Sequence, residues 1–255
     1  MQRASGILRL DCTVTSSRRQ RIRTLLKGIE TGDPAAVEVV NPNKYIQHNP
    51  QTHEGGEGLA ALFKRISQSS PKVNVVRAFE DGEYVFAHTE YDFSTRRIGF
   101  EVFRFEGDQA VEHWDNIQER KGPNTDGNSM VDGPTEVTDL ARTEANRKLV
   151  RSLVADVFVG GGLDQFSAYV DESDLTEHSP ELDLEAKASA MNYQRIHRVL
   201  AEGNFVLVAS EGDSRGVWTA FYDLFRVAEG KVVEHWDTIE TIPPRVEWKN
   251  DNGKF

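Results

Sequence analysis

The chain has few of the features that define several classes of protein. Its single cysteine, Cys12, excludes an intrachain disulfide and fits a reducing compartment, so we expect a cytoplasmic protein. No apolar run approaches the roughly 20 residues of a membrane-spanning helix, so we expect no membrane partner. The formal net charge of -11 lacks the basic excess that nucleic acids select, so we expect no nucleic-acid partner.

Two common catalytic signatures are also missing. The glycine-rich segment Gly55–Gly58 has no following Lys-Ser/Thr pair, and no serine nucleophile elbow occurs. The amino-terminal apolar patch Gly6–Leu10 contains Arg9 and is too short for a secretory signal. We therefore expect residues 1–15 to form a disordered extension, and we expect no cofactor.

What the chain does contain is a long internal repeat. The string Val-Glu-His-Trp-Asp occurs at Val111–Asp115 and again at Val233–Asp237. Upstream, Tyr45–Pro50 corresponds to Leu175–Pro180. The offset is 122 residues at the first landmark and 130 at the second, too long a period for a solenoid repeat of about 20–50 residues. The sequence therefore predicts two copies of one domain, at residues 16–120 and 140–242.

Each copy reads as helices followed by strands. Ile22, Leu25, Leu26 and Ile29 follow a helical spacing after the capping candidates Ser16 and Ser17, and Leu149–Phe158 repeats this plan. Strands are predicted at 84–93, 98–105 and 110–118, and at 205–211, 217–227 and 232–240. Helices followed by an antiparallel meander predict an α+β fold. Residues 121–139 have the composition of a linker, and 243–255 are predicted to leave the fold as a tail.

The repeated string places a histidine and an aspartate on one face of a strand. Residues two apart on a strand share a face, so His113 points with Asp115, and His235 with Asp237. On the preceding strand Glu101 shares a face with Phe103. Imidazole suits proton transfer near neutral pH, and a carboxylate beside it fixes its tautomer and supports its charge. The pattern therefore predicts a pocket for general acid–base chemistry. Trp114 and Trp236 face the other side, with Arg104 and Arg226 in ion pairs there.

The segments Tyr45–Pro50, Arg104–Phe105 and Glu112–Asp115 resemble the SnoaL-like polyketide cyclases of the NTF2-like superfamily. The resemblance covers both copies. It implies two NTF2-like domains, each a curved antiparallel sheet with about three amino-terminal helices that form a cone-shaped pocket. It also implies cofactor-free chemistry on a small, apolar carbonyl compound, of cyclase, isomerase or dehydratase type. Non-catalytic ligand binding is the alternative, and a structural module with filled pockets is a third.

The resemblance assigns candidate site residues by position. His113, Asp115 and His48 are the catalytic candidates. Residues expected to contact substrate are His88, Glu101, Phe103, His178, Asp223, His235 and Asp237. For each histidine a structural hydrogen-bond role is the alternative. His48, His113 and Asp115 are a possible metal set, because two histidines and a carboxylate can hold iron, but we predict no metal.

The second copy departs from the first. The position of His88 is occupied by Ala209 or Ser210, and the Gly55–Gly58 segment has no equivalent. The second site is therefore predicted to be the more degenerate of the two. We expect the copies to pack through their sheets as an internal pseudo-dimer, with the chain a monomer. A light-scattering mass of twice 28.7 kDa would contradict that expectation.

Overall fold

The computed structural model describes residues 16–255, so Cys12 and the extension predicted at 1–15 lie outside the described residues. The chain folds into two α+β halves that repeat one topology. The strand order is β1-β5-β4-β3-β2 in the first sheet and β6-β10-β9-β8-β7 in the second. The predicted fold class is thereby confirmed. No helix among these residues is long and apolar enough to cross a bilayer.

The first half begins with two helices, and a 3₁₀ turn and a short strand lie between them in the sequence. Helix α1 (Arg18–Thr31) is capped by the Ser17 side chain, which accepts from the Gln20 amide, and ends at Gly32 with φ 68°. A 3₁₀ turn follows at Pro34–Val39. The remaining elements are β1 (Ile46–Gln47), α2 (Gly55–Ser67), β2 (Lys72–Asp81), β3 (Tyr84–Asp92), β4 (Arg96–Glu106) and β5 (Gln109–Glu119).

The second half repeats this order with local changes. Helix α3 (Thr143–Leu153) continues as a π-helical turn at Val154–Val159. The later elements are α4 (Phe166–Tyr169), β6 (Thr176–Glu177), α5 (Leu184–Ala190), β7 (Asn192–Glu202), β8 (Phe205–Ser214), β9 (Val217–Ala228) and β10 (Lys231–Thr241). The predicted strands are confirmed to within about three residues at each end.

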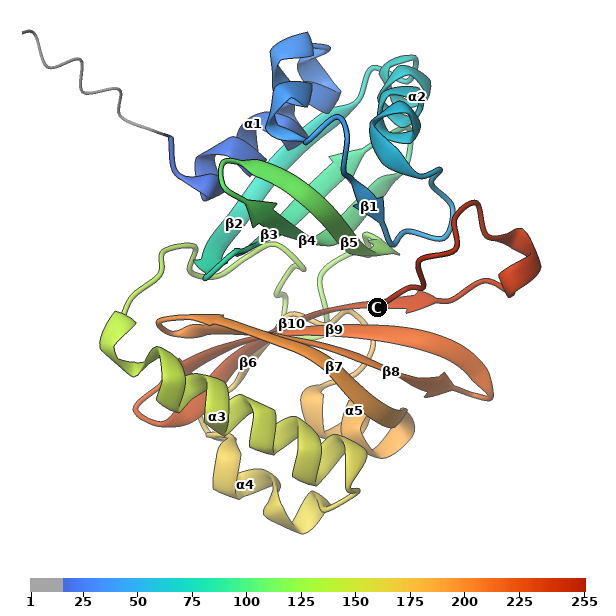
Figure 1. The fold of residues 1–255 in the computed structure, drawn as a ribbon. Coiled ribbons are helices and arrows are strands. Elements are labelled where there is room, and N and C mark those ends of the chain that lie inside the picture. Colours follow the sequence, from blue (N-terminus) through green and yellow to red (C-terminus); the bar gives the residue numbers. More distant parts are fainter. Residues whose placement is uncertain (1–15) are drawn as a thin grey trace, which may run out of the picture.

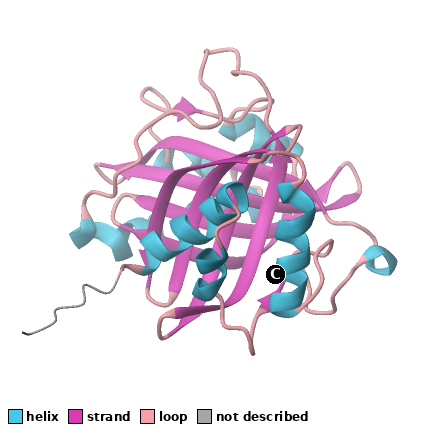
Figure 2. Ribbon diagram, turned by 90° about the horizontal axis from the view of Figure 1, so that it is seen from above, coloured by secondary structure: helices cyan, strands magenta, loops and turns pink. Residues whose placement is uncertain are grey.

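The two sheets face each other across the middle of the molecule, and the helices cover their outer faces (Figures 1 and 2). The apolar cluster between the sheets contains Trp114 and Phe86 from the first half and Trp236 and Leu207 from the second. Matching arginines reach across, with Arg77 4.2 Å from the Trp236 ring centroid and Arg198 3.8 Å from that of Trp114. The predicted packing through the sheets is therefore present. Each half also has its own core beneath its helices.

The prediction that residues 243–255 leave the fold is wrong. This segment folds back over the first half: Asn250 donates to the carbonyls of Asn49 and Thr52, and the Lys249 amide donates to Pro50 O. The linker at 121–139 is equally ordered, with Met130 only 3% exposed. We call residues 121–139 and 243–255 the two arms. Their polar composition did not reveal these contacts, because both arms bind mainly through backbone groups and amide side chains.

Candidate functional site

Strand pairing assembles a polar cluster inside the first half. In the β4–β5 register Glu101 lies opposite Asp115, and Phe103 opposite His113. The short strand β1 runs parallel to β5 and places Gln47 beside His113. Because all of these side chains project from one face of the sheet, they converge beneath α1 and α2. Glu101, His113 and Asp115 are 3%, 7% and 5% exposed, so the cluster is buried.

The cluster forms a connected chain of hydrogen bonds. His113 Nε2 lies 2.7 Å from Glu101 Oε2, and His113 Nδ1 lies 3.1 Å from Gln47 Oε1. The Asn49 amide donates to the same Gln47 oxygen at 2.8 Å, which identifies that atom as an acceptor. His113 Nδ1 therefore carries a proton that it donates to Gln47. A single further proton is then shared between His113 Nε2 and Glu101.

Two neighbours hold the carboxylates in place. Tyr91 Oη donates to Glu101 Oε1 at 2.8 Å, and Asn49 Nδ2 donates to Asp115 Oδ2 at 2.7 Å. Gly99 permits the first contact, since a Cβ there would lie 2.6 Å from Glu101 Oε1 and 2.7 Å from the Tyr91 ring. Asp115 Oδ1 has no hydrogen-bond partner among residues 16–255. That oxygen lies 3.6 Å from Lys254 Nζ, within ion-pair distance.

A cavity of about 340 Å³ adjoins this cluster. Its wall combines the polar group with apolar side chains from both helices and the sheet, among them Leu25, Leu26, Ile29, Leu59, Phe63, Phe103 and Ile117. Tyr45 also lines it, and its buried hydroxyl has no hydrogen-bond partner in the described chain. Burial, followed by the charges of Glu101 and Asp115, raises the pKa of Tyr45 well above its ordinary value. Tyr45 therefore stays a neutral phenol and can donate.

The predicted site residues of the first half divide into two groups. Glu101, Phe103, His113 and Asp115 line the cavity. His48 instead lies against the far face of the sheet, where it stacks on Trp114 and its ring nitrogens lie 2.9 Å from Glu112 Oε1 and Gly253 O. His88 faces the second half, with its Nδ1 2.8 Å from Arg77. The predictions that His48 is catalytic and that His88 contacts substrate are therefore wrong, because each points to the sheet face opposite the cavity.

The second half brings the equivalent residues together but fills the space between them. His235 Nε2 lies 3.1 Å from Asp223 Oδ1, and its Nδ1 lies 2.9 Å from both Glu177 oxygens. Lys187 from α5 reaches both carboxylates, at 2.5 Å from Asp223 Oδ1 and 2.6 Å from Asp237 Oδ2. All of these groups are buried. The ammonium of Lys187 occupies the centre of the cluster, and nothing in the sequence pattern indicated it.

Electrostatics fix the charges of this second cluster. Burial lowers the pKa of His235, but Glu177 and Asp223 outweigh that effect and raise it to about 9. Burial raises the pKa of Asp223, but Lys187 and His235 lower it to about 2. The pKa of Lys187 is raised, because its two carboxylate partners outweigh its burial. At neutral pH the imidazolium and the ammonium are therefore both held by carboxylates, and their raised pKa values disfavour release of a proton from either.

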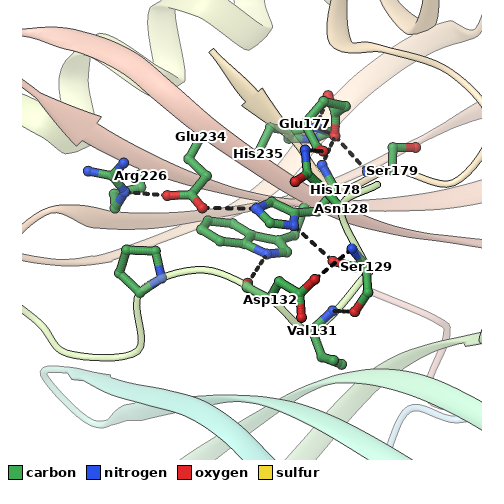
Figure 3. A network of polar contacts seen from close by, with 12 residues as sticks. Asn128, Ser129, Val131, Asp132, Glu177, His178, Ser179, Arg226, Glu234 and His235 are labelled. Atoms are coloured by element: carbon green, nitrogen blue, oxygen red, sulfur yellow. Dashed lines mark hydrogen bonds and ion pairs between the residues drawn. The ribbon is translucent and has the colours of Figure 1, made fainter. Parts of the chain in front are cut away.

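His178 makes the same kinds of contact as its counterpart His48. The His178 ring stacks on Trp236, and its nitrogens lie 2.8 Å from Glu234 Oε1 and Ser129 O (Figure 3). Arg226 donates to the other Glu234 oxygen, and Arg104 donates to Glu112 in the first half, as predicted. Both histidines thus bind the arm that follows the opposite half. The His178 ring points to Glu234 and Ser129, and its backbone amide is the group that reaches the second cluster, where it donates to Glu177 Oε1 at 2.9 Å, so its predicted substrate contact is also wrong.

Three groups of the first cluster could hold a metal ion. Glu101, His113 and Asp115 each offer one ligand atom, and these atoms lie within 4.8 Å of one another. This set differs from His48, His113 and Asp115, because the structure places His48 on the sheet face opposite His113 and Asp115. A metal would have to displace the hydrogen bond between His113 Nε2 and Glu101.

Comparisons with known proteins give distant likenesses. No protein-family model and no curated protein matches the chain. Among solved structures, TsrD from Streptomyces laurentii is 19% identical with a TM-score of 0.35, covering 39% of this chain and 86% of its own. IdmH from Streptomyces antibioticus, provisionally named a polyketide cyclase, is 15% identical with a TM-score of 0.37, covering 40% and 93%. A provisionally named ketosteroid isomerase from Kribbella flavida is 21% identical with a TM-score of 0.35, covering 40% and 84%. Likenesses this distant carry no information about activity.

Proposed function

We propose that the first half is the catalytic half of a SnoaL-like small-molecule enzyme. It would move protons on an apolar carbonyl compound without a cofactor, as a cyclase, isomerase or dehydratase does. The observation that carries the proposal is the Glu101–His113 pair, whose Oε2 and Nε2 atoms lie 2.7 Å apart beside a cavity of about 340 Å³ with largely apolar walls. Buried pairs of this kind are typical of general acid–base sites.

The roles follow from the hydrogen bonds. Asp115 is the group proposed to accept a proton from the carbon next to the substrate carbonyl, and the C–H electron pair then forms an enolate. His113, held by Gln47 and Glu101, returns a proton to the enolate carbon or oxygen. Tyr45 donates to the carbonyl oxygen, because its hydroxyl is neutral and uncommitted within the described residues. Donors aimed at a developing oxyanion are typically worth about 10²–10³ in rate.

Solvent-deuterium exchange tests this proposal before the natural substrate is known. We would follow loss of the α-hydrogens of 2-tetralone, an apolar cyclic ketone, in D₂O by NMR. We expect Asp115→Asn and His113→Phe to slow exchange by about 10²–10⁴-fold, the usual contribution of a positioned acid or base. Tyr45→Phe removes a single oxygen and is expected to cost about tenfold or more.

The matched control is Glu177→Gln, which alters the equivalent cluster in the second half and is expected to leave exchange unchanged. If folded Asp115→Asn exchanges as fast as the native protein, the assignment of the base is wrong. If 2-tetralone binds the native protein but exchanges no faster than in buffer, the cavity holds ligands without acting on them.

A further inference from the structure

The carboxyl-terminal arm, residues 243–255, carries a buried lysine into the first half's site. The arm is fixed along its length: Asn252 donates to Gln47 O, His48 Nδ1 lies 2.9 Å from Gly253 O, and Phe255 stacks on His197 with ring centroids 4.1 Å apart. Between these anchors lies Lys254, which is only 3% exposed. The second half thus contributes a charged group beside the first half's cluster.

Lys254 lies between two carboxylates from different halves. Its Nζ donates to Glu240 Oε2 at 2.6 Å and to the Asp115 carbonyl at 2.8 Å, and lies 3.6 Å from Asp115 Oδ1. That oxygen is the one without a hydrogen bond in the part of the chain described. Glu240 comes from β10 yet lines the first half's cavity. Asp115, Glu240 and Lys254 therefore form one charged group across the interface, in which Asp115 and Lys254 are buried and the Glu240 side chain is 24% exposed.

The other arm shows that a lysine is not needed to make this crossing. Residues 121–139 cross to the second half, where Ser129 O meets His178 as Gly253 O meets His48. The residue after Ser129 is Met130, which is buried and apolar. Position 130 thus corresponds to position 254, and the two arms differ there by a full positive charge. Only the arm that lies beside the open cavity carries it.

The electrostatics explain what that charge does. Two carboxylates held close together away from bulk water disfavour each other's ionisation unless a cation accompanies them. Burial raises the pKa of Glu240, and Lys254 acts in the opposite direction. The two carboxylates outweigh the burial of Lys254 and raise its pKa. The other titratable or charged groups around this cluster are Tyr45, Tyr91, Glu101 and His113 from the first half and Arg198 and Tyr222 from the second.

We propose that Lys254 is a positioning residue of the first half's site, which keeps Asp115 and Glu240 ionised together and fixes Asp115 Oδ1. Lys254 thereby contributes to a site about 140 positions earlier in the sequence. This inference rests on the proposed function, because an ionised Asp115 is what the proposed proton abstraction needs. Without Lys254 the Asp115–Glu240 pair would bind a proton, and the pair would titrate as a unit.

The test is the protonation of that pair in the full-length protein. We would label aspartate and glutamate side chains with ¹³C and record carboxyl NMR spectra at pH 7 for the native protein and Lys254→Met. We expect one protonated carboxyl in Lys254→Met that is absent from the native protein, assigned by its loss in Lys254→Met combined with Asp115→Asn or Glu240→Gln. Lys254→Arg should restore the native spectrum, because it restores the charge. Met130→Leu, the matched change in the other arm, should leave it unchanged.

A folded Lys254→Met protein in which both carboxyls stay ionised at pH 7 would overturn the inference. If Lys254→Met does not fold, the double variant Lys254→Met/Glu240→Gln decides, since it removes the like-charge conflict. We expect this double variant to fold with Asp115 ionised, and a protonated Asp115 there would equally contradict the inference. The readout needs no turnover, so absence of 2-tetralone exchange would count against the proposed function and leave this result intact.

Discussion

The two halves share a topology and a His–Asp string, yet their interiors differ in kind. In the first half, neutral Gln47 faces His113 Nδ1, and Gly99 leaves space below Tyr91. In the second half Glu177 stands in the place of Gln47, and Phe221 stands in the place of Gly99. Phe221 stacks on Tyr193 with ring centroids 4.2 Å apart. Lys187 adds the charge that neutralises the second cluster. One scaffold thus carries an open, proton-sharing pair in one half and a closed ion-pair network in the other.

The tyrosines show how the same hydrogen bond persists through substitution. In the first half Tyr91 of β3 pairs with Val73 of β2, and Tyr91 donates to Glu101. In the second half the pair at this place is Gly212 and Tyr193, and Tyr193 donates to Asp223 at 2.9 Å. The phenol has moved to the neighbouring strand while its acceptor stayed. A position-by-position comparison of the two copies misses this exchange, because only the strand register reveals it.

The largest effect should come from removing the lysine of the closed cluster. Lys187→Met leaves Asp223 and Asp237 buried without their shared cation, and breaking such a pair from one side costs about 3–5 kcal/mol. Urea unfolding measures the loss. Lys64→Met on the exposed face of α2 is the control and should change the free energy of unfolding by less than about 0.5 kcal/mol. Equal stability of the two variants would mean that Lys187 does not hold the second half closed.

A pH-dependent difference should follow from the charge of His235. Its pKa is raised from 6.5 to about 9, so its stabilisation is fully present below pH 6.5 and is lost as the pH rises through about 9. Glu177→Gln removes one of the partners responsible. We expect it to lower the free energy of unfolding clearly at pH 6 and much less at pH 9.5, by urea titration. An equal loss of stability at both pH values would show that Glu177 does not help to keep His235 protonated.

The paired arginines between the sheets should contribute unequally. Arg77 is 2% exposed and also donates to the carbonyls of Val131, Asp132 and Pro134, whereas Arg198 is half-buried and has only its cation–π contacts among the interactions found in residues 16–255. We expect Arg77→Met to destabilise by about 2–3 kcal/mol and Arg198→Met by about 1 kcal/mol or less. Thermal or urea unfolding of the two variants compares them directly. A larger loss from Arg198→Met would reverse this order.

The smallest effect on chemistry should come from His48. Its ring lies on the sheet face opposite the cavity, and Gln keeps a polar group that can reach Gly253 O, so His48→Gln is expected to leave 2-tetralone exchange within about twofold of native. Exchange rates at saturating and limiting ketone check this. A loss approaching that of His113→Phe would return His48 to the catalytic group.

The sequence predicted the repeated α+β plan because strand alternation and turn residues are local signals. It also placed Glu101, His113 and Asp115 on one wall, since the period of a strand fixes which side chains share a face. It could not place His48, because the direction of a loop side chain depends on the arm that meets it. The roles of Lys187 and Lys254 could not be predicted for the same reason. Each lysine enters its cluster from a segment whose position is set only by tertiary packing.

The most direct test of the difference between the halves exchanges the acceptor beside each histidine. Gln47→Glu gives His113 the carboxylate that holds His235 as an imidazolium, and Glu177→Gln is the reciprocal change. At pH 7 we expect Gln47→Glu to slow 2-tetralone exchange by at least about tenfold, because His113 would retain its proton, and Glu177→Gln to leave the rate unchanged. Native exchange in Gln47→Glu, or loss of exchange in Glu177→Gln, would contradict the assignment of the active site to the first half.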